Sequence, residues 1–342
     1  MKITDITFTL LFLISTTFIL FVGKSILLPI IFAILFYFLV RSFKRFFDRI
    51  PFVKHQIPNW IKSTFATVFL IYILYFIVNL FINNSLKLPV FIQNNEAKID
   101  KTILYFNQNF NNQLIEKFIN TLENFNFSSL INPIINSTTS FLGNLVLVVF
   151  YLLFLLLEEN SFKSKLKSIF TLEEKFNQAV QILQKIERSI TDYIGFKSLI
   201  SLISAIVSFF IIYSSGLAFP FLWASFIFVF NFIPVIGIFL SILIPSLFSY
   251  LQFDSINSTL ILLSVLSVVQ LLISNILEPK LLGKSLNISP LVSMIALTFW
   301  GAIWGIPGMI ISTPITVIII VLLANIPRTH SIAILLSNNG DV

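Results

Sequence analysis

The sequence predicts an all-α, polytopic integral membrane protein with about eight transmembrane helices and two helical hairpins that are broken by Gly and Pro. Of its 342 residues, 57% are hydrophobic and only 11% are charged, whereas soluble domains carry about 25% charged residues. Residues 198–253, 255–277 and 285–327 contain no charged side chain, and a spanning helix needs about 20 mostly apolar residues. These runs are continuous, whereas a transmembrane β-barrel would show short segments of alternating hydrophobicity.

Two short apolar segments open the chain. They cover about 6–22 and 26–40, and Gly23 and Lys24 are expected to form the tight turn between them. Helices joined by so short a link are expected to pair as a tight antiparallel hairpin. A third span is expected at about 63–82, after a basic segment.

Two polar stretches flank the fourth span. Residues 83–137 carry apolar side chains every three or four positions, which predicts an amphipathic helical insert outside the cytoplasm. After a span at about 139–157, residues 158–196 predict a second amphipathic helical segment, on the cytoplasmic side. A fifth span is expected at about 197–214, after a break at Gly195.

The C-terminal part contains two long apolar runs that are interrupted near their middles. Residues 216–252 are interrupted at Asn231–Gly237, and residues 290–325 at Gly301–Gly308. Each run is long enough for two short passes, which either cross fully or dip into the bilayer and return. A single span at about 255–277 lies between the two runs.

The basic residues predict the orientation. With the N-terminus inside and ten helical passes, 17 of the 22 Lys and Arg residues lie on the inner side. A topology of eight spans with re-entrant segments gives the same distribution. Cytoplasmic loops of membrane proteins are enriched in these two residues. We therefore expect one integral membrane domain over 1–342, multi-pass in the cell (inner) membrane and in contact with membrane lipids, with both termini cytoplasmic.

Several functional classes are excluded by what the sequence lacks. It has no cysteine, which excludes disulfides and thiol catalysis. It has no P-loop and no Gly-x-Ser-x-Gly motif, so we expect no enzyme, no catalytic residues and no cofactor. His55 and His330 are far apart in sequence, so no metal site is expected. The basic residues lie between spans, so no nucleic-acid partner is expected.

The two interruptions are the strongest indication of function. A break inside hydrocarbon frees backbone N–H and C=O groups, which are tolerated only within protein or beside a wet cavity. Interrupted helices in two corresponding regions are typical of transporter substrate sites. We expect the breaks to meet near the middle of the membrane and to line a cavity, with Gly237 and Gly305 admitting close backbone approach. The alternative is that Gly and Pro serve only helix packing or kinking.

Polar residues near the breaks are further candidates. Asn231 lies in a long uncharged run, where it either hydrogen-bonds a neighbouring helix or lines the pathway. Gln270 lies on the next span, and Glu278 with Pro279 is expected to end that span. No carboxylate lies deeper than a span edge, which argues against a proton or Na⁺ relay. The predicted substrate-pathway residues are Asn231, Pro234, Gly237, Pro245, Gln270, Glu278, Pro279, Gly301, Gly305, Gly308 and Pro314.

Three motifs resemble those of the autoinducer-2 exporter family of permeases. They are Asn231–Gly237 with Pro245 after it, Leu277–Gly283 followed by Pro290, and the C-terminal set Gly301, Gly305, Gly308 and Pro314. Their order and spacing agree with the family pattern. The N-terminal half resembles the family in its hydropathy layout.

The resemblance implies an inner-membrane secondary transporter of seven or eight spans that forms homo-oligomers. The family takes its name from export of a small polar sugar derivative, which favours a small polar solute here. Other members are associated with cation–proton antiport, so the first alternative is an Na⁺(Li⁺)/H⁺ antiporter that depends on Glu278. The second alternative is a non-transporting membrane scaffold or sensor that binds a ligand through residues 83–137.

Overall fold

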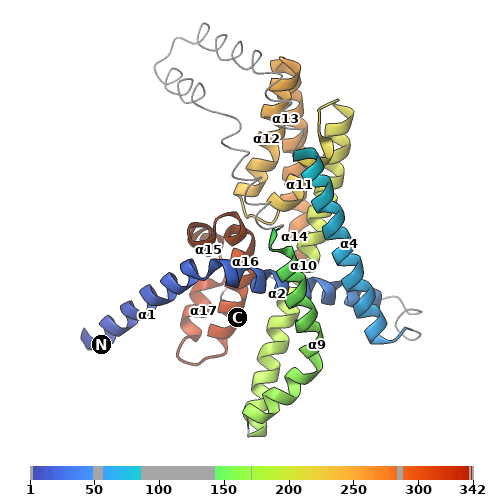
Figure 1. Ribbon diagram of the computed structural model, residues 1–342. Coiled ribbons are helices and arrows are strands. Elements are labelled where there is room, and N and C mark those ends of the chain that lie inside the picture. The colour runs from blue at the N-terminus through green and yellow to red at the C-terminus, as the bar shows by residue number, and fades with distance from the viewer. Residues whose placement is uncertain are drawn as a thin grey trace. The chain divides into compact units, whose positions relative to one another are not determined.

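The computed structural model describes residues 3–48, 57–85, 143–170, 172–282, 288–338 and 340, and every regular element within them is helical (Figure 1). The predicted all-α class is therefore confirmed. In chain order the elements are α1 (Ile3–Val22), α2 (Lys24–Asp48), α4 (Asn59–Ser85), α9 (Leu145–Ile169), α10 (Glu173–Ser214), α11 (Pro220–Phe230), α12 (Ile236–Phe253), α13 (Ile256–Leu272), the π-helical turn η1 (Ile273–Leu277), α14 (Glu278–Leu282), α15 (Pro290–Trp304), α16 (Ile306–Ala324) and α17 (His330–Leu336).

The described part of the chain contains six helices that are long and apolar enough to cross a membrane. They are α2, Ile61–Leu80 of α4, α10, α12, the helical stretch Ile256–Leu282 and α16. Helices α11 and α15 have only 11 and 15 residues, which correspond to about 16 and 22 Å of length. Because the hydrocarbon core is about 30 Å thick, neither reaches across by itself. The predicted polytopic membrane class is confirmed, and the two short helices are the first arms of the broken hairpins.

The chain divides into two compact units, each of which is described by itself. Unit 1 comprises Met1–Ile71, Asn144–Ser198 and Leu281–Val342, and unit 2 comprises Tyr72–Gly143 and Leu199–Lys280. Beyond Ser85, the predicted insert 83–137 lies outside the described residues. The predicted amphipathic segment 158–196 consists of the end of α9, a short turn and the first part of α10.

In unit 1, α10 packs against α2. The contact is centred on three buried residues of α10, Ile190, Tyr193 and Ile194, and their apolar neighbours are Leu35, Phe38, Leu39, Ile186, Leu282 and Ile318. A Cβ on Gly195 would overlap the side chain of Ser42, so the glycine lets α2 and α10 approach closely. The predicted break at Gly195 is wrong, because α10 is continuous from Glu173 to Ser214; this glycine serves packing.

The predicted hairpin of the first two helices is also wrong. The Gly23 N–H donates to the Ile19 carbonyl at 2.8 Å, and the Gly23 carbonyl accepts from the Leu27 N–H at 2.9 Å. Both are bonds of the α-helical i to i−4 type, so Gly23 bends the chain without reversing it. Helix α2 consequently leads away from α1 instead of folding back alongside it (Figure 1).

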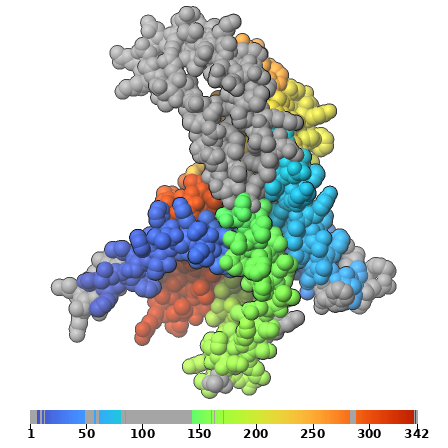
Figure 2. Space-filling model, viewed as in Figure 1, coloured from blue at the N-terminus to red at the C-terminus, as the bar shows by residue number. Residues whose placement is uncertain are grey.

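Helix α1 keeps a largely uncovered apolar surface (Figure 2). Phe8, Ile14 and Phe18 are each more than half exposed. One polar contact holds α1 to α15, in which the Trp304 indole donates to the Leu20 carbonyl at 2.9 Å. Hydrocarbon tails are as apolar as these side chains, so the exposed surface of α1 suits contact with lipid.

In unit 2, one side chain holds the loop that leads from α10 into α11. The Oε1 atom of Gln252 accepts from the Ala218 N–H at 2.7 Å, and its Nε2 atom donates to the Gly216 carbonyl at 2.9 Å. The Trp223 indole donates to the Ala218 carbonyl at 2.9 Å. These bonds satisfy the loop backbone and set the position at which α11 starts.

The helix of the span predicted at about 255–277 continues past Glu278. The helix that begins with α13 continues through the π-helical turn η1 into α14 and ends at Leu282. The Glu278 N–H donates to the Ile273 carbonyl, five residues back. In a regular α-helix the ring of Pro279 would clash with the carbonyl four residues earlier. The wider π-turn before Pro279 relieves that conflict and lets the helix continue.

Candidate functional site

The first predicted break is a tight turn in unit 2, between α11 and α12. Its unwound segment is 231–235, which is shorter than predicted, because α12 already begins at Ile236. Val235 has φ 59° and ψ −62°, and the Ile236 N–H donates to the Pro234 carbonyl at 2.6 Å. These are the features of a γ-turn with positive φ, which is strained and rare for a β-branched residue.

Gly237 lies directly after this turn, in the first turn of α12. A Cβ on Gly237 would overlap the carbonyl group of Phe230. Helix α12 therefore packs on the last peptide group of α11, and a larger residue fits only if the backbone moves. Gly237 therefore admits a close backbone approach within its own hairpin. Pro245 is buried farther along α12.

The second predicted break is a single residue in unit 1, between α15 and α16. Gly305 has φ 66° and ψ −145°, a region that essentially only glycine adopts. No heavy atom of the described residues lies within 4 Å of the place that a Cβ on Gly305 would take. Within unit 1 the backbone conformation, not the available space, therefore requires glycine here, and a close approach of Gly305 to the first break stays a prediction.

The close approach in this second hairpin occurs instead at two helical glycines. A Cβ on Gly308 would overlap the Trp300 carbonyl, and a Cβ on Gly301 would lie 3.0 Å from the side chain of Met309. Pro314 is buried farther along α16. The two hairpins thus share one arrangement, in which a glycine near the start of the second helix packs on a carbonyl near the end of the first.

Gln270, another predicted pathway residue, is the centre of a buried polar cluster in unit 2. The Ser204 hydroxyl donates to its Oε1 atom at 3.0 Å, and its Nε2 atom donates to the Ser208 hydroxyl at 3.1 Å. Gln270 is 1% exposed, and both serines are fully buried. Ser201, three residues before Ser204 on α10, is also fully buried, and its hydroxyl has no hydrogen-bond partner among the described residues.

Asn231 has unmet hydrogen-bonding capacity too. It is 6% exposed, and its Nδ2 atom lacks a partner within the described ranges, as do the buried hydroxyls of Ser241 and Ser249 on α12. A buried polar group without a partner costs about 1–3 kcal/mol. Such groups are therefore rare unless a ligand or water completes them.

The pathway residues predicted from the sequence do not include these serines. Ser201, Ser204 and Ser208 recur at spacings of three and four residues, which places them on one face of α10. That periodicity indicates a shared polar face, but serine is common in apolar helices and usually bonds to its own backbone. Ser246 does so, since its hydroxyl donates to the Ile242 carbonyl at 2.8 Å.

Glu278 and Pro279 begin α14, directly after the π-turn. Glu278 is only partly buried. In the part of the chain that the structure describes, no group of three or more His, Asp or Glu residues could hold a metal ion. The first break belongs to unit 2 and the second to unit 1, and the expectation that they meet stays a prediction.

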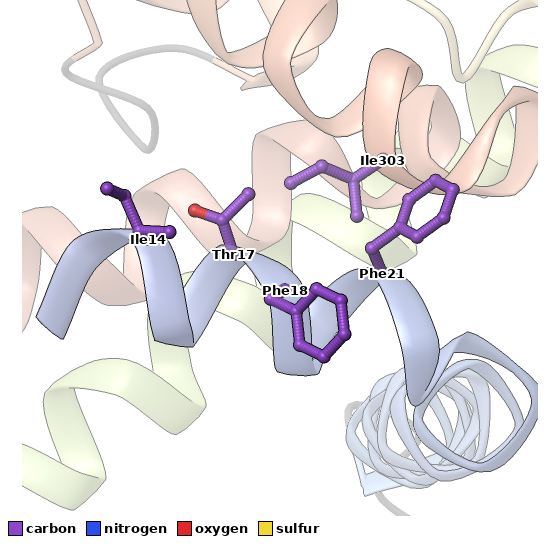
Figure 3. A pocket seen from close by; sticks show the side chains of 5 residues that line it. All are labelled: Ile14, Thr17, Phe18, Phe21 and Ile303. Atoms are coloured by element: carbon purple, nitrogen blue, oxygen red, sulfur yellow. The ribbon is translucent and has the colours of Figure 1, made fainter. Parts of the chain in front are cut away.

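A hollow of about 450 Å³ in unit 1 has a different character (Figure 3). It is lined by Ile14, Thr17, Phe18 and Phe21 of α1 and by Ile303 of α15. Among the described lining residues, Thr17 supplies the only side-chain hydroxyl, so the hollow suits apolar contact and offers little to a polar solute.

A polytopic helical chain with two interrupted hairpins and buried, uncharged hydrogen-bonding groups has the features of a membrane transporter. Comparison with known proteins gives the same class and makes it specific. The family model described as AI-2E family transporter matches residues 6–328. The chain belongs to the AI-2E transporter family, which is a family of permeases and not of enzymes.

Three relatives illustrate the similarity. A Borreliella burgdorferi protein, whose name assigns it to transport without a substrate, is 37% identical over 219 residues, covering 63% of this chain and 60% of its own. AI-2 transport protein TqsA of Escherichia coli is 29% identical over 210 residues, covering 61% of this chain and 60% of its own. A transport-named protein of Haemophilus influenzae is 25% identical over 296 residues, covering 84% of both chains. The chain thus aligns with about 60% of the length of the first two relatives.

Proposed function

We propose that this protein exports a small, uncharged polar solute across the cell membrane. The buried polar groups of unit 2 carry the proposal, because hydrogen-bonding atoms of Ser201, Asn231, Ser241 and Ser249 have no partner within the described residues. Hydroxyl and amide groups can donate to and accept from the hydroxyl groups of a solute without adding charge. Similarity to TqsA, which is named for AI-2 transport, supports a solute of this kind.

The character of the buried residues favours an uncharged solute over a coupling cation. No Asp or Glu is buried in the described part of the chain. Carboxylates within spans mark proton and ion relays. An Na⁺(Li⁺)/H⁺ antiporter would have to depend on Glu278, which is only partly buried.

A pair of buried serines on α12 tests the proposal in liposomes that contain the purified full chain. Ser241 and Ser246 are both 1% exposed, but only Ser246 has its hydrogen bond satisfied by its own helix. We expect the liposomes to release at least one solute from a panel of radiolabelled neutral polyols and sugars. Ser241→Ala should lower the efflux rate about tenfold, for the loss of one hydrogen bond of about 1.4 kcal/mol, and Ser246→Ala should leave it unchanged.

Other outcomes would identify the alternatives. A pH-driven Na⁺ or Li⁺ flux that disappears in Glu278→Gln would establish antiport and overturn the proposal. No flux of any solute or cation, with a ligand bound by residues 83–137, would establish the sensor. Equal effects of Ser241→Ala and Ser246→Ala would show that these hydroxyls serve packing.

Orientation and assembly belong to the same proposal. The distribution of Lys and Arg supports cytoplasmic termini, and the family resemblance supports a homo-oligomer. Because the chain has no cysteine, single cysteines report orientation without background. An impermeant thiol reagent should label Asn95→Cys in intact cells and should label Ser164→Cys only after permeabilisation; the reverse pattern would invert the topology.

A further inference from the structure

A single arginine in unit 1 joins three helices outside the predicted pathway. The guanidinium group of Arg41, on α2, donates through Nη2 to Glu159 of α9 and through Nη1 to Glu187 of α10, both at 2.5 Å. Its Nε atom donates to the Tyr37 hydroxyl at 3.0 Å. Each of the three nitrogen atoms of one planar group is therefore used by a different side chain.

The position of Arg41 makes this contact the link between α9 and α10. Helix α2 packs along α9, and it also packs against α10 through Leu35, Phe38 and Leu39. Figure 1 shows the turn between α9 and α10 lying well away from α2. The α9–α10 arms are thus held from one side by α2, and Arg41 touches both of them.

The other ion pairs nearby do not repeat this role. Arg45 pairs with Asp192 at 2.8 Å, which ties α2 to α10 alone. Lys165 and Glu158 pair at 3.2 Å within α9 and are more than half exposed. Arg41, in contrast, is 25% exposed and both of its carboxylate partners are 31% exposed, so its bonds are partly shielded from water and strengthened.

We propose that Arg41 is a positioning residue that acts as a latch between α9 and α10. With both carboxylates bound, the arms are held in the observed spacing. Release of either carboxylate lets α10 move relative to α9. Since α10 is one continuous helix from Glu173 to Ser214, it carries such a movement along its length to Ser204 and Ser208, which hold Gln270.

The effect of the latch on transport rests on the proposed function, whereas its effect on the spacing of α9 and α10 does not. The chemistry of the contact also predicts its response to substitution. Lysine keeps the charge of Arg41 but presents a point charge in place of a planar fork, so it can satisfy one carboxylate well but not both in the observed geometry. All three charged groups retain contact with solvent, so substituted chains should still fold.

Distance measurement between two spin labels tests the latch without any solute. The natural absence of cysteine allows labels at Ser164→Cys on α9 and Gln181→Cys on α10, both exposed positions, in the full chain in liposomes. We expect Arg41→Gln to raise the ratio of wide to narrow spacings about fivefold or more, and Arg41→Lys, which keeps one carboxylate, to give part of that rise. Glu159→Gln and Glu187→Gln should each give part of that change, and Glu158→Gln none.

Three results of the distance measurement would overturn the latch. They are an Arg41→Gln distance distribution that matches wild type, full rescue of the spacing by Arg41→Lys, and a Glu158→Gln effect as large as that of Glu187→Gln. The thermal unfolding midpoint, measured on the same samples, must stay unchanged for a positioning role; a fall that accounts for the change in spacing would assign Arg41 to stability instead. If the spacing responds as expected but wild type moves no solute, the proposed function fails and the latch stands.

Discussion

The α11–α12 hairpin of unit 2 and the α15–α16 hairpin of unit 1 reverse the chain by different means. The first uses five unwound residues and places Val235 at φ 59°, whereas the second uses Gly305 alone, at φ 66°. Both then pack a helical glycine, Gly237 or Gly308, on a carbonyl of the preceding helix. The common requirement is therefore the close packing of the two arms, and the turn that permits it is free to differ.

The largest expected effect comes from filling the shared contact. Gly237→Val and Gly308→Val should each destabilise the chain by about 3 kcal/mol or more, because the new side chain would overlap a backbone carbonyl that cannot rotate away. Transport should be abolished in both, with membrane insertion retained. Thermal unfolding in detergent and solute efflux measure the two effects.

Gly143 provides the control for these variants. Among the described residues, no heavy atom lies within 4 Å of its Cβ position, and its φ is not positive. Gly143→Val should therefore be close to neutral. If Gly237→Val or Gly308→Val transports normally, the arms do not need this contact, and the comparison between the hairpins fails.

A smaller effect is expected at Gly305, where only the backbone conformation matters. Gly305→Ala should cost about 1–3 kcal/mol, since the new residue would be held in a sparsely populated region of φ and ψ. Asparagine tolerates the left-handed helical region but not this one, so Gly305→Asn should not restore stability. A neutral Gly305→Ala variant, judged by its unfolding midpoint, would contradict the assigned turn.

Asn231 should affect transport more than stability. Its Nδ2 atom has no partner among the described residues, so Asn231→Leu removes an unsatisfied polar group and roughly keeps the volume. We expect a stability change below about 1 kcal/mol and a clear rise in the solute concentration at half-maximal rate. A large loss of stability with unchanged solute affinity would place the Asn231 amide in the packing of the turn.

The smallest expected effect has the opposite sign. Val235→Gly should relieve the positive φ of a β-branched residue and stabilise the first hairpin by up to about 1 kcal/mol, after the greater backbone entropy of glycine is subtracted. It would make the first turn resemble the second. A raised unfolding midpoint supports this comparison, and a lowered one shows that Val235 gains more from its contacts than it loses in strain.

The sequence by itself determined the class of this protein and the places where its helices are interrupted. Transfer into hydrocarbon is a property of each side chain, so the uncharged runs identified the apolar helices without any partner. The breaks near Pro234 and Gly305 followed from the same local rules, since Gly and Pro change the backbone at their own positions. The three motifs were likewise sufficient for the family.

Only the tertiary structure decided which residues touch. It assigned close packing to Gly308 instead of Gly305, kept α10 continuous at Gly195, and continued the helix past Pro279 through a π-turn. It also gathered Ser204, Ser208 and Gln270, and joined Arg41 to two carboxylates more than a hundred residues away in the chain. Each of these depends on what another segment presents at the point of contact, and hydropathy or residue spacing within one segment holds no information about that.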